Sequence, residues 1–328
     1  MEIAKKPLRK KSLSKKPKLT PEQKAAQKAK TKLLMKKNWM LYLFLLPVVI
    51  YIFIFNYLPL YGIQIAFKNF NSGLGIWGSP WVGMQWFEMF FNSPRAWTLI
   101  KNTLSLSFFS ILIGFPIPII LALMLNSLKN ERFKKFTQTI TYMPHFISVV
   151  VLVGMITAFL SPRSGFIVTL LEPFLGERIY FMGDAKYFDA IYVLSNVWQS
   201  AGWGSIIYIA ALSGVSPELH EAAIMDGATR FKRIFYIDLP AIVPTIIILL
   251  VLRCGSLMTV GFEKVLLLQN NLNLAQSEVI STYTYKLGLL QSQYSYSTAI
   301  GLFNNVINFI ILILVNRFAK KLSGSSLW

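Results

Sequence analysis

The sequence predicts an all-α membrane protein with six transmembrane helices and with both termini in the cytoplasm. The 328 residues are 54% hydrophobic and only 14% charged, whereas about a quarter of the residues in a soluble domain are charged. The charges are also clustered, which leaves several uncharged stretches longer than the roughly 20 residues that span a bilayer as a helix. Helices are the expected spanning form because they satisfy their own backbone hydrogen bonds in lipid.

Each predicted span is a long apolar run. We expect one membrane helix at about 40–60, 100–126, 137–160, 190–212, 239–262 and 297–318. Arg253 alone interrupts the fifth run, and Pro144 and His145 near the start of the third make its edges the hardest to place. The chain thus divides into a basic N-terminal tail, 1–38, and a six-helix transmembrane domain, 39–328.

The distribution of Lys and Arg sets the orientation, because these residues are enriched in cytoplasmic segments. Of the 33 Lys and Arg residues, fourteen lie in the tail and ten more lie in segments 126–138, 213–238 and 317–328. The longer segments on the other side hold eight, and Arg253 lies inside a span. The N-terminus is therefore expected inside, and segment 213–240 becomes a cytoplasmic loop.

The net charge of +19 comes mostly from this tail, and it could indicate a nucleic-acid partner. The tail has no aromatic residue before Trp39 on which bases could stack. A basic segment beside a membrane helix is instead typical of attraction to anionic lipid. Thr20-Pro21-Glu22-Gln23 forms a capping-box pattern, so 21–37 is predicted to be a helix and 1–19 to be disordered.

The composition argues against a catalytic or metal centre. The chain has a single cysteine, Cys254, and two histidines, His145 and His220, without metal-ligand spacing. It has neither a phosphate-binding Gly-Lys-Ser/Thr loop nor a Gly-x-Ser-x-Gly nucleophile elbow. We expect no metal, no cofactor and no enzymatic activity in this chain.

The loop 213–240 carries the most informative pattern. Ser216 and Pro217 are suited to the N-terminus of a short helix, and Asp226-Gly227 is a turn signal. Thr229 can cap a second short helix, and Pro240 marks the start of the next span. The small side chains of Ala222 and Ala223 leave room for the surface of a soluble partner. The alternative is a solvated loop without a partner.

This stretch resembles the EAA loop of ABC importer permeases: Glu-Ala-Ala, three residues, Gly, nine residues, Ile, one residue, Leu-Pro. The matching residues are Glu221, Ala222, Ala223, Gly227, Ile237, Leu239 and Pro240, and Asp226 and Ala228 complete the Asp-Gly-Ala core of sugar-importing members. Asn102-Thr103-Leu104 and the C-terminal segment 316–328 are similar to permeases for complex oligosaccharides, including fragments that contain uronate.

The resemblance implies the permease subunit of an ATP-driven importer that moves a sugar, and an oligosaccharide in particular, across a bacterial-type cytoplasmic membrane by alternating access. It implies a second homologous permease in a heterodimer, an extracellular solute-binding protein, and two ATPase subunits that bind ATP and Mg. Glu221 is expected to meet a basic residue of the ATPase. The ATPase-coupling residues would be Glu221, Ala222, Ala223, Asp226, Gly227, Ala228, Leu239 and Pro240.

Polar side chains inside spans are candidates for sugar binding, because they are costly in lipid and tend to face the bundle interior. These candidates are Trp198, Gln199, Arg253, Asn304 and Asn308. Hydrogen bonding between helices is an equal alternative for each. Arg253 could pair with a sugar carboxylate, with Glu263 or with backbone carbonyls.

Two other function classes fit a membrane chain. A secondary transporter or channel would need intramembrane acids for ion coupling, and none lies deep in a predicted span. A membrane-embedded sugar-transferring enzyme would need a catalytic cluster at an interface, and Asp184 and Asp189 have no motif around them.

Overall fold

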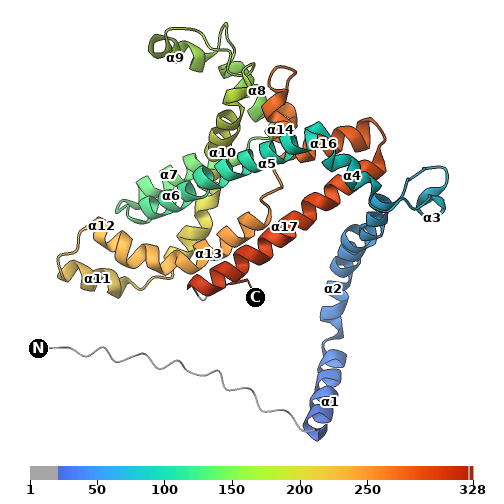
Figure 1. Ribbon diagram of the computed structural model, residues 1–328. Helices are drawn as coiled ribbons and strands as arrows, with labels where there is room; N and C mark the ends of the chain where they lie inside the picture. The colour runs from blue at the N-terminus through green and yellow to red at the C-terminus, as the bar shows by residue number, and fades with distance from the viewer. Residues whose placement is uncertain (1–20, 324–325, 328) are drawn as a thin grey trace, which may run out of the picture. The chain divides into compact units, whose positions relative to one another are not determined.

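The computed structural model describes residues 21–323 and 326–327, and the regular secondary structure of this part is helical apart from one antiparallel bridge between Lys68 and Trp81 (Figure 1). The predicted disorder of 1–19 lies outside the described residues. The internal contacts divide the chain into two units, 1–62 and 63–328, and each unit is described by itself.

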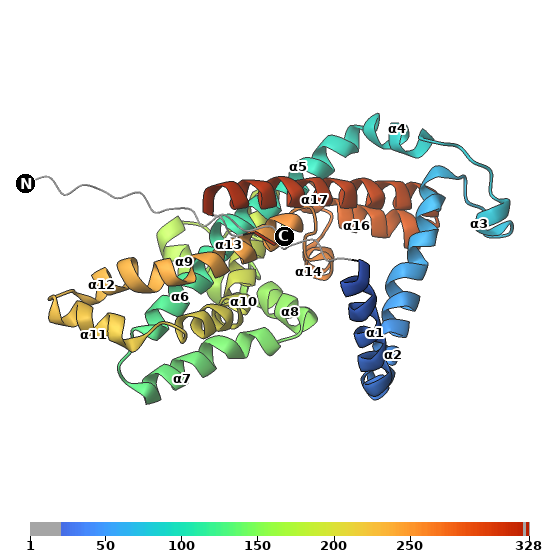
Figure 2. The ribbon, with the colours of Figure 1, turned by 90° about the horizontal axis from the view of Figure 1, so that it is seen from below.

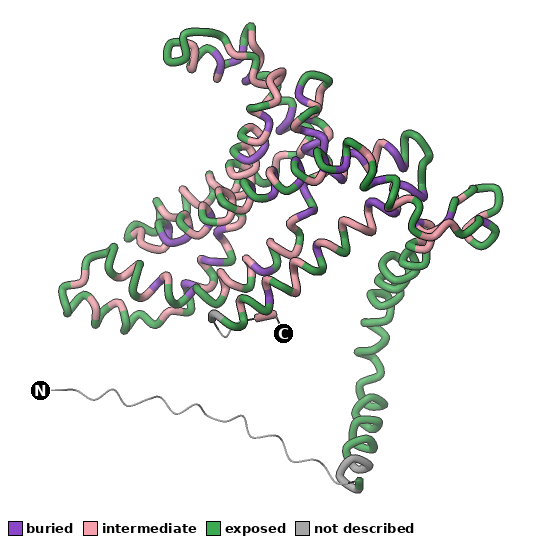
Figure 3. The backbone as a smooth tube through the Cα atoms, viewed as in Figure 1, coloured by how far each residue is buried: buried purple, intermediate pink, exposed green. Residues whose placement is uncertain are grey.

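The first unit is helical where it is described. It holds α1 (Pro21–Lys37), α2 (Trp39–Ile52), the π-helical η1 (Phe53–Tyr57) and the start of the 3-10 helix η2 (Leu58–Phe67). The helix expected at 21–37 is thus confirmed, and the predicted span 40–60 lies within a helical stretch from Trp39 to Phe67. Figure 3 shows the residues of α2 as exposed along its whole length.

The second unit carries the remaining elements in a single chain path. Its α-helices are α3 (Gly75–Gly78), α4 (Gln85–Phe91), α5 (Pro94–Gly114), α6 (Pro116–Asn126), α7 (Glu131–Tyr142), α8 (Val149–Phe159), α9 (Phe166–Leu175), α10 (Phe188–Leu212), α11 (Pro217–Met225), α12 (Arg230–Arg233), α13 (Leu239–Gly255), α14 (Phe262–Leu268), α15 (Leu274–Ser277), α16 (Ile280–Tyr285) and α17 (Tyr294–Ser323). Shorter 3-10 or π-helical turns are η3 (Met143–Phe146), η4 (Ala185–Tyr187), η5 (Ile234–Asp238) and η6 (Lys286–Leu290).

Four helical stretches in the described part are long and apolar enough to cross a membrane, and a fifth is bent. The four are Trp39–Phe67, Pro94–Asn126, Arg230–Gly255 and Tyr294–Lys321. The third predicted span differs from the expected single helix, because η3 separates α7 from α8 and the axis bends by 97°. Pro144 lacks the N–H that a continuous helix would need, and Ser148 starts α8 afresh by accepting the N–H of Val151.

Two other predicted spans also differ from the structure. At 190–212 the structure has α10, which is 25 residues long but includes Asn196, Gln199 and Ser200 and is less apolar than the four. The helix predicted at 239–262 ends at Gly255, and residues 256–261 form an irregular turn before α14. The structure therefore establishes an all-α membrane protein with four or five candidate spans among the described residues.

Three apolar clusters hold the second unit together. One joins α6, α10 and α13 around Tyr208, Leu212 and Ile242, a second joins α4, α5, α16 and α17, and a third joins α5, α8, α10 and α14. Figure 2 shows α17 running alongside α13 and α16, which it contacts. The clusters fix the relative positions of α5, α10 and α13, the three helices that line the polar cavity described below.

The Asn102-Thr103 pair has a structural role at the start of the second predicted span. The amide of Asn102 donates to the carbonyls of Ala275 and Glu278 at 2.9 and 3.0 Å, and the hydroxyl of Thr103 accepts the N–H of Ile280 at 3.0 Å. Both side chains are buried. The pair thus ties the segment between α15 and α16 to α5.

Candidate functional site

The loop 213–240 folds as two short helices joined by a tight turn, as its turn residues predict. Ser216 occupies the N-cap of α11 and Pro217 its first position, although the Ser216 side chain makes no capping hydrogen bond. Thr229 caps α12 by accepting the N–H of Lys232 at 3.4 Å. The helix-turn-helix expectation is therefore confirmed.

The end of α11 explains the spacing between the alanines and the glycine of the motif. Gly227 has φ +73°, a left-handed conformation that glycine adopts without steric cost. The N–H of Gly227 donates to Ile224 O at 3.0 Å, and the N–H of Ala228 donates to Ala223 O at 2.8 Å. These two bonds form a Schellman motif, which satisfies the last carbonyls of a helix. Ala223, Gly227 and Ala228 are therefore the residues that end α11.

Of the remaining motif residues, some lie on the protein surface and others pack into the core. Glu221, Ala222 and Asp226 are exposed, and large exposed apolar side chains lie beside them, including Met225, with 87% of its surface exposed, and Phe231, with 74%. An exposed face that mixes acidic side chains with apolar groups is suited to binding another protein.

The Leu-Pro end of the motif joins this surface to the membrane helices. Leu239 packs against the cluster formed by α6, α10 and α13, as does Ile234 of the preceding turn. Pro240 is the second residue of α13, and the helical path continues into it from α12 and η5.

One contact of the loop was not found by sequence reasoning. Nε2 of His220 lies 3.2 Å from Oδ1 of Asp238, whose side chain is 5% exposed. The sequence indicates only that His220 lacks metal-ligand spacing, and it does not single out Asp238. An acid directly before Leu239-Pro240, at the cytoplasmic edge of a predicted span, was the available signal.

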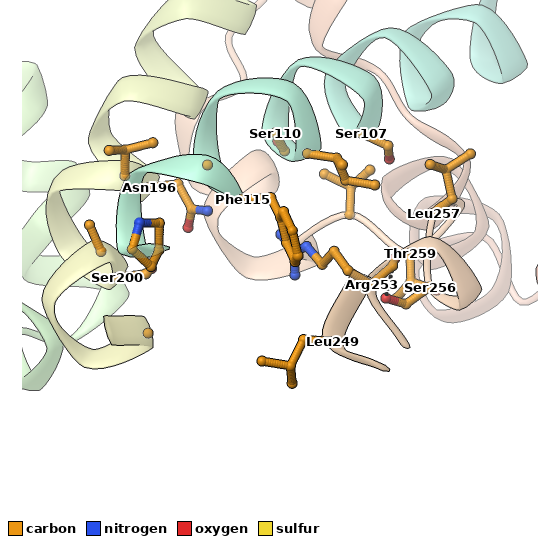
Figure 4. A pocket seen from close by; sticks show the side chains of 18 of the residues that line it. Ser107, Ser110, Phe115, Asn196, Ser200, Leu249, Arg253, Ser256, Leu257 and Thr259 are labelled. Carbon is orange, nitrogen blue, oxygen red and sulfur yellow. Dashed lines mark hydrogen bonds between the residues drawn. The ribbon is translucent and has the colours of Figure 1, made fainter. Parts of the chain in front are cut away.

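A polar cavity of about 450 Å³ lies between α5, α10 and α13. Figure 4 shows its labelled lining residues, among them Ser107, Ser110, Asn196, Ser200 and Arg253. Four of these five were not among the sequence candidates. Their spacing was a usable signal, because residues three or four apart share one helix face, as do Ser107 with Ser110 and Asn196 with Ser200.

Arg253 is the one sequence candidate that lines this cavity. It lies in the last turn of α13, and its own backbone carbonyl accepts the hydroxyl of Ser256 at 3.1 Å. No carboxylate of the described residues, Glu263 included, lies within ion-pair distance of its guanidinium. The cavity wall thus carries a cation without a carboxylate partner in the described part of the chain.

The predicted asparagines of α17 hold the turn after α13. Oδ1 of Asn308 accepts the N–H of Met258 at 2.8 Å, and its amide donates to the hydroxyl of Thr259 at 3.0 Å. The amide of Asn304 donates to Met258 O at 3.2 Å. Both asparagines therefore make the hydrogen bonds between segments that were the alternative to sugar contact.

Trp198 and Gln199, the two remaining candidates, lie on α10 and make their contacts outside the polar cavity. The amide of Gln199 donates to Ile147 O at 2.9 Å, in the break between α7 and α8. Trp198 lines a separate cavity of about 510 Å³, formed by side chains such as Leu152, Phe159 and Leu194. The structure does not bring Trp198 or Gln199 to the polar cavity.

Lys264 is an unusual charge beside the cavity wall. It is 5% exposed, and its Nζ has no hydrogen-bond partner among the described residues. Nζ lies 5.3 Å from the ring centre of Tyr192, which lines the cavity and whose hydroxyl accepts the N–H of Gly261. Burial lowers the pKa of Lys264 to about 8, because desolvation disfavours the charged amine.

Known proteins resemble this chain over most of its length. Protein LplB of Bacillus subtilis is 44% identical over 294 residues, which are 90% of this chain and 92% of LplB. The polygalacturonan/rhamnogalacturonan transport system permease protein YteP of the same organism is 44% identical over 288 residues, 88% of this chain and 90% of YteP.

A solved structure also matches both in fold and in sequence. It is the crystal structure of a bacterial ABC transporter involved in the import of the acidic polysaccharide alginate. One of its chains is 42% identical, with a TM-score of 0.82, and the match covers 90% of this chain and 99% of that one. A second structure of the alginate transporter, in complex with a periplasmic protein that holds an alginate pentasaccharide, matches with 41% identity and the same TM-score.

The family model of the binding-protein-dependent transport system inner membrane component matches residues 114–324, a region that includes the loop 213–240 and most of the cavity wall. The identities above extend the similarity to about nine-tenths of the chain. The chain belongs to this family: it is a permease of an ABC importer in the bacterial inner membrane, and not the ATPase of that importer.

Proposed function

We propose that this chain is one of two permease subunits of an importer for oligosaccharides that carry carboxylate groups, and that Arg253 binds such a carboxylate in the polar cavity. The observation that carries the proposal is the position of Arg253 on the cavity wall without a carboxylate partner in the described residues. The relatives support it, since their names give polygalacturonan and alginate, both acidic polymers, as transported substrates.

The depth of Arg253 supports this role. Arg253 follows Pro240, which marks the start of the span, by 13 residues. This separation corresponds to roughly 20 Å along a helix, so Arg253 lies past the middle of a 30 Å hydrocarbon layer. A bare arginine at such a depth costs about 2.5–3.5 kcal/mol. A bidentate pair with a substrate carboxylate would offset that cost whenever the substrate is bound.

The other lining groups fit a sugar chain. Hydroxyls of Ser107, Ser110 and Ser200 and the amide of Asn196 can exchange hydrogen bonds with sugar hydroxyls. Tyr192 and Phe115 add aromatic surface. In this proposal Asn304 and Asn308 shape the cavity wall by holding the turn after α13, while Gln199 and Trp198 stay outside the polar path.

The assembly follows from the family. We infer six membrane crossings, in which the bent α7–α8 segment and the more polar α10 are the third and the fourth. A second permease completes the path, and an extracellular binding protein delivers the sugar. Two ATPase subunits bind beneath the permease pair, and this chain contributes the face of α11 and α12 on which Glu221, Ala222 and Asp226 are exposed. ATP binding favours one orientation of the cavity over the other, as alternating access requires.

The test is uptake of matched acidic and neutral oligosaccharides by the complete transporter in proteoliposomes, with its binding protein. We expect Arg253→Gln to lower uptake of the acidic sugar by about tenfold or more and to change uptake of the neutral sugar little. Arg253→Lys should restore only part of the loss, because an ammonium cannot pair in the bidentate way. The control is Arg95→Gln, which removes an exposed charge outside the cavity. Equal losses for both sugars would show that Arg253 is structural.

A further inference from the structure

Asp238 is a buried carboxylate at the junction between the coupling loop and a membrane helix. It is the last residue of η5 and directly precedes α13, and the residue is 4% exposed. A carboxylate in such a place is strongly destabilising unless hydrogen bonds or charges compensate it. Its partners are therefore informative about which parts of the protein must stay together.

Two elements other than its own supply these partners. Nε2 of His220, on α11, lies 3.2 Å from Oδ1 of Asp238. The amide of Asn126, at the end of α6, donates to the same oxygen at 3.5 Å. Arg233 of α12 adds charge attraction, and its buried Nε has no hydrogen-bond partner in the described part of the chain. One carboxylate oxygen thus joins α11, α6 and the start of α13.

The coupling helix has few other attachments. No residue of α11 is buried. Among the described residues, the contact of His220 with Asp238 is the one polar side-chain link between α11 and another element. Apart from the chain connections at its two ends, α11 is therefore held against the membrane helices mainly through His220.

We propose that His220, Asp238 and Asn126 form a positioning contact that transmits displacement of the coupling helix α11 to α13 and α6. His220 directly precedes Glu221, so that any movement that a partner imposes on Glu221 also moves the imidazole. Asp238 directly precedes α13, whose last turn carries Arg253. A helix is stiff along its axis, and the 15 residues between Asp238 and Arg253 span roughly 22 Å. The contact therefore connects the ATPase face to the polar cavity.

The inference rests on the proposed coupling role of loop 213–240, and its test separates the two. The complete transporter is assayed in proteoliposomes with three readouts: the amount of ATPase that co-purifies, substrate-stimulated ATP hydrolysis, and sugar molecules transported per ATP hydrolysed. The variants are His220→Ala, Asp238→Asn, the two combined, and His220→Gln, whose amide can still donate to Asp238. Glu221→Ala is the separate arm for the coupling loop itself.

We expect His220→Ala and Asp238→Asn to leave ATPase attachment intact and to lower transport per ATP by at least about fivefold, the lower end of typical coupling effects. The combined variant should be no worse than either alone, because both remove one contact. His220→Gln should retain most of the wild-type ratio of sugar molecules transported per ATP hydrolysed. Glu131→Gln is the matched control, since it breaks the ion pair between an exposed glutamate and Lys134 on α7.

Two results overturn the proposal. One is an unchanged transport-per-ATP ratio in His220→Ala and Asp238→Asn while Glu221→Ala loses ATPase attachment or coupling. In that case the loop couples ATP hydrolysis to transport, but this contact does not transmit the displacement of α11. The other is a fall of transport and hydrolysis in proportion to the amount of assembled complex. That result would show that the contact only stabilises the structure. If Glu221→Ala itself transports normally, the coupling role of the loop fails first.

Discussion

Oδ1 of Asn308, near the middle of α17, accepts the backbone N–H of Met258 at 2.8 Å. With the bonds of Asn308 to Thr259 and of Asn304 to Met258 O, this bond holds the turn that follows α13, and Met258 is only 2% exposed. The same turn contributes Thr259, Val260 and Gly261 to the polar cavity. An amide in the sixth predicted span therefore shapes the cavity without lining it.

The first prediction concerns this amide. Asn308→Leu should leave the N–H of Met258 buried without an acceptor, at a cost of about 1–3 kcal/mol. Asn308→Asp keeps the acceptor and should cost less than Asn308→Leu. Thermal unfolding of the purified transporter in detergent measures both. The matched variant is Asn304→Ala, which removes a longer 3.2 Å bond to a carbonyl, and a larger effect there than in Asn308→Leu would contradict this account.

Gly227 gives a prediction about the coupling turn. A Cβ at Gly227 would meet no atom within 4 Å, so the cost of substitution comes from the φ of +73° alone. Gly227→Asn should be tolerated, because asparagine populates this region. Gly227→Val should lower transport strongly, since a β-branched residue there is an outlier. Uptake by membrane vesicles with equal amounts of transporter distinguishes the two variants, and equal activity of both would be evidence against the Schellman turn.

A third prediction uses the close approach of α10 to α7. A Cβ on Gly202 would overlap the carbonyl of Thr141, and a backbone group cannot move aside cheaply. Gly202→Ala should therefore reduce the amount of folded protein in the membrane. Gly301→Ala on α17 is the matched control, because its Cβ would meet nothing within 4 Å and alanine favours helix by up to about 1 kcal/mol. Normal levels of the Gly202 variant would contradict the packing.

Lys264 gives a pH dependence. Its folded pKa of about 8 lies below the ordinary value of 10.5, so between these values the folded state binds fewer protons than the unfolded state. The free energy of unfolding should therefore rise with pH across this interval. Below about pH 8 the desolvation cost is fully present, at about 3 kcal/mol.

Lys264→Met should remove both effects: it should be more stable than the wild type at neutral pH and lack the extra rise above about pH 8. Unfolding midpoints across the pH series measure this difference, with Lys101→Met, at an exposed lysine, as the reference. A wild type and a Lys264 variant with parallel pH curves would show that the amine is solvated or paired.

The sequence was sufficient for features that depend on local chemistry. The coupling turn was predictable because Pro217, Asp226-Gly227 and Thr229 each have a position-specific backbone preference. The apolar runs predicted the long helices because the helix length needed to cross lipid is fixed. Arg253 was found because an isolated charge in such a run is conspicuous.

What the sequence missed depends on contacts between distant segments. Asn304 and Asn308 belong on α17 as predicted, but only the path of the turn at 256–261 shows that they bond Met258. The break between Phe146 and Val149 needed the cap at Ser148 and the bond from Gln199 to Ile147 to be recognised. Asp238 looked like an ordinary loop acid until the chain placed His220 and Asn126 beside it.

The Schellman turn has a consequence for how the motif can vary. Because α11 ends at Gly227, the number of residues from Glu221 to Gly227 determines the angular position of the glutamate around the helix axis. Each residue of a helix adds a rotation of about 100°. An insertion or deletion of one residue inside this interval would therefore keep every chemical group of the motif and still turn Glu221 by about 100° relative to the Schellman turn.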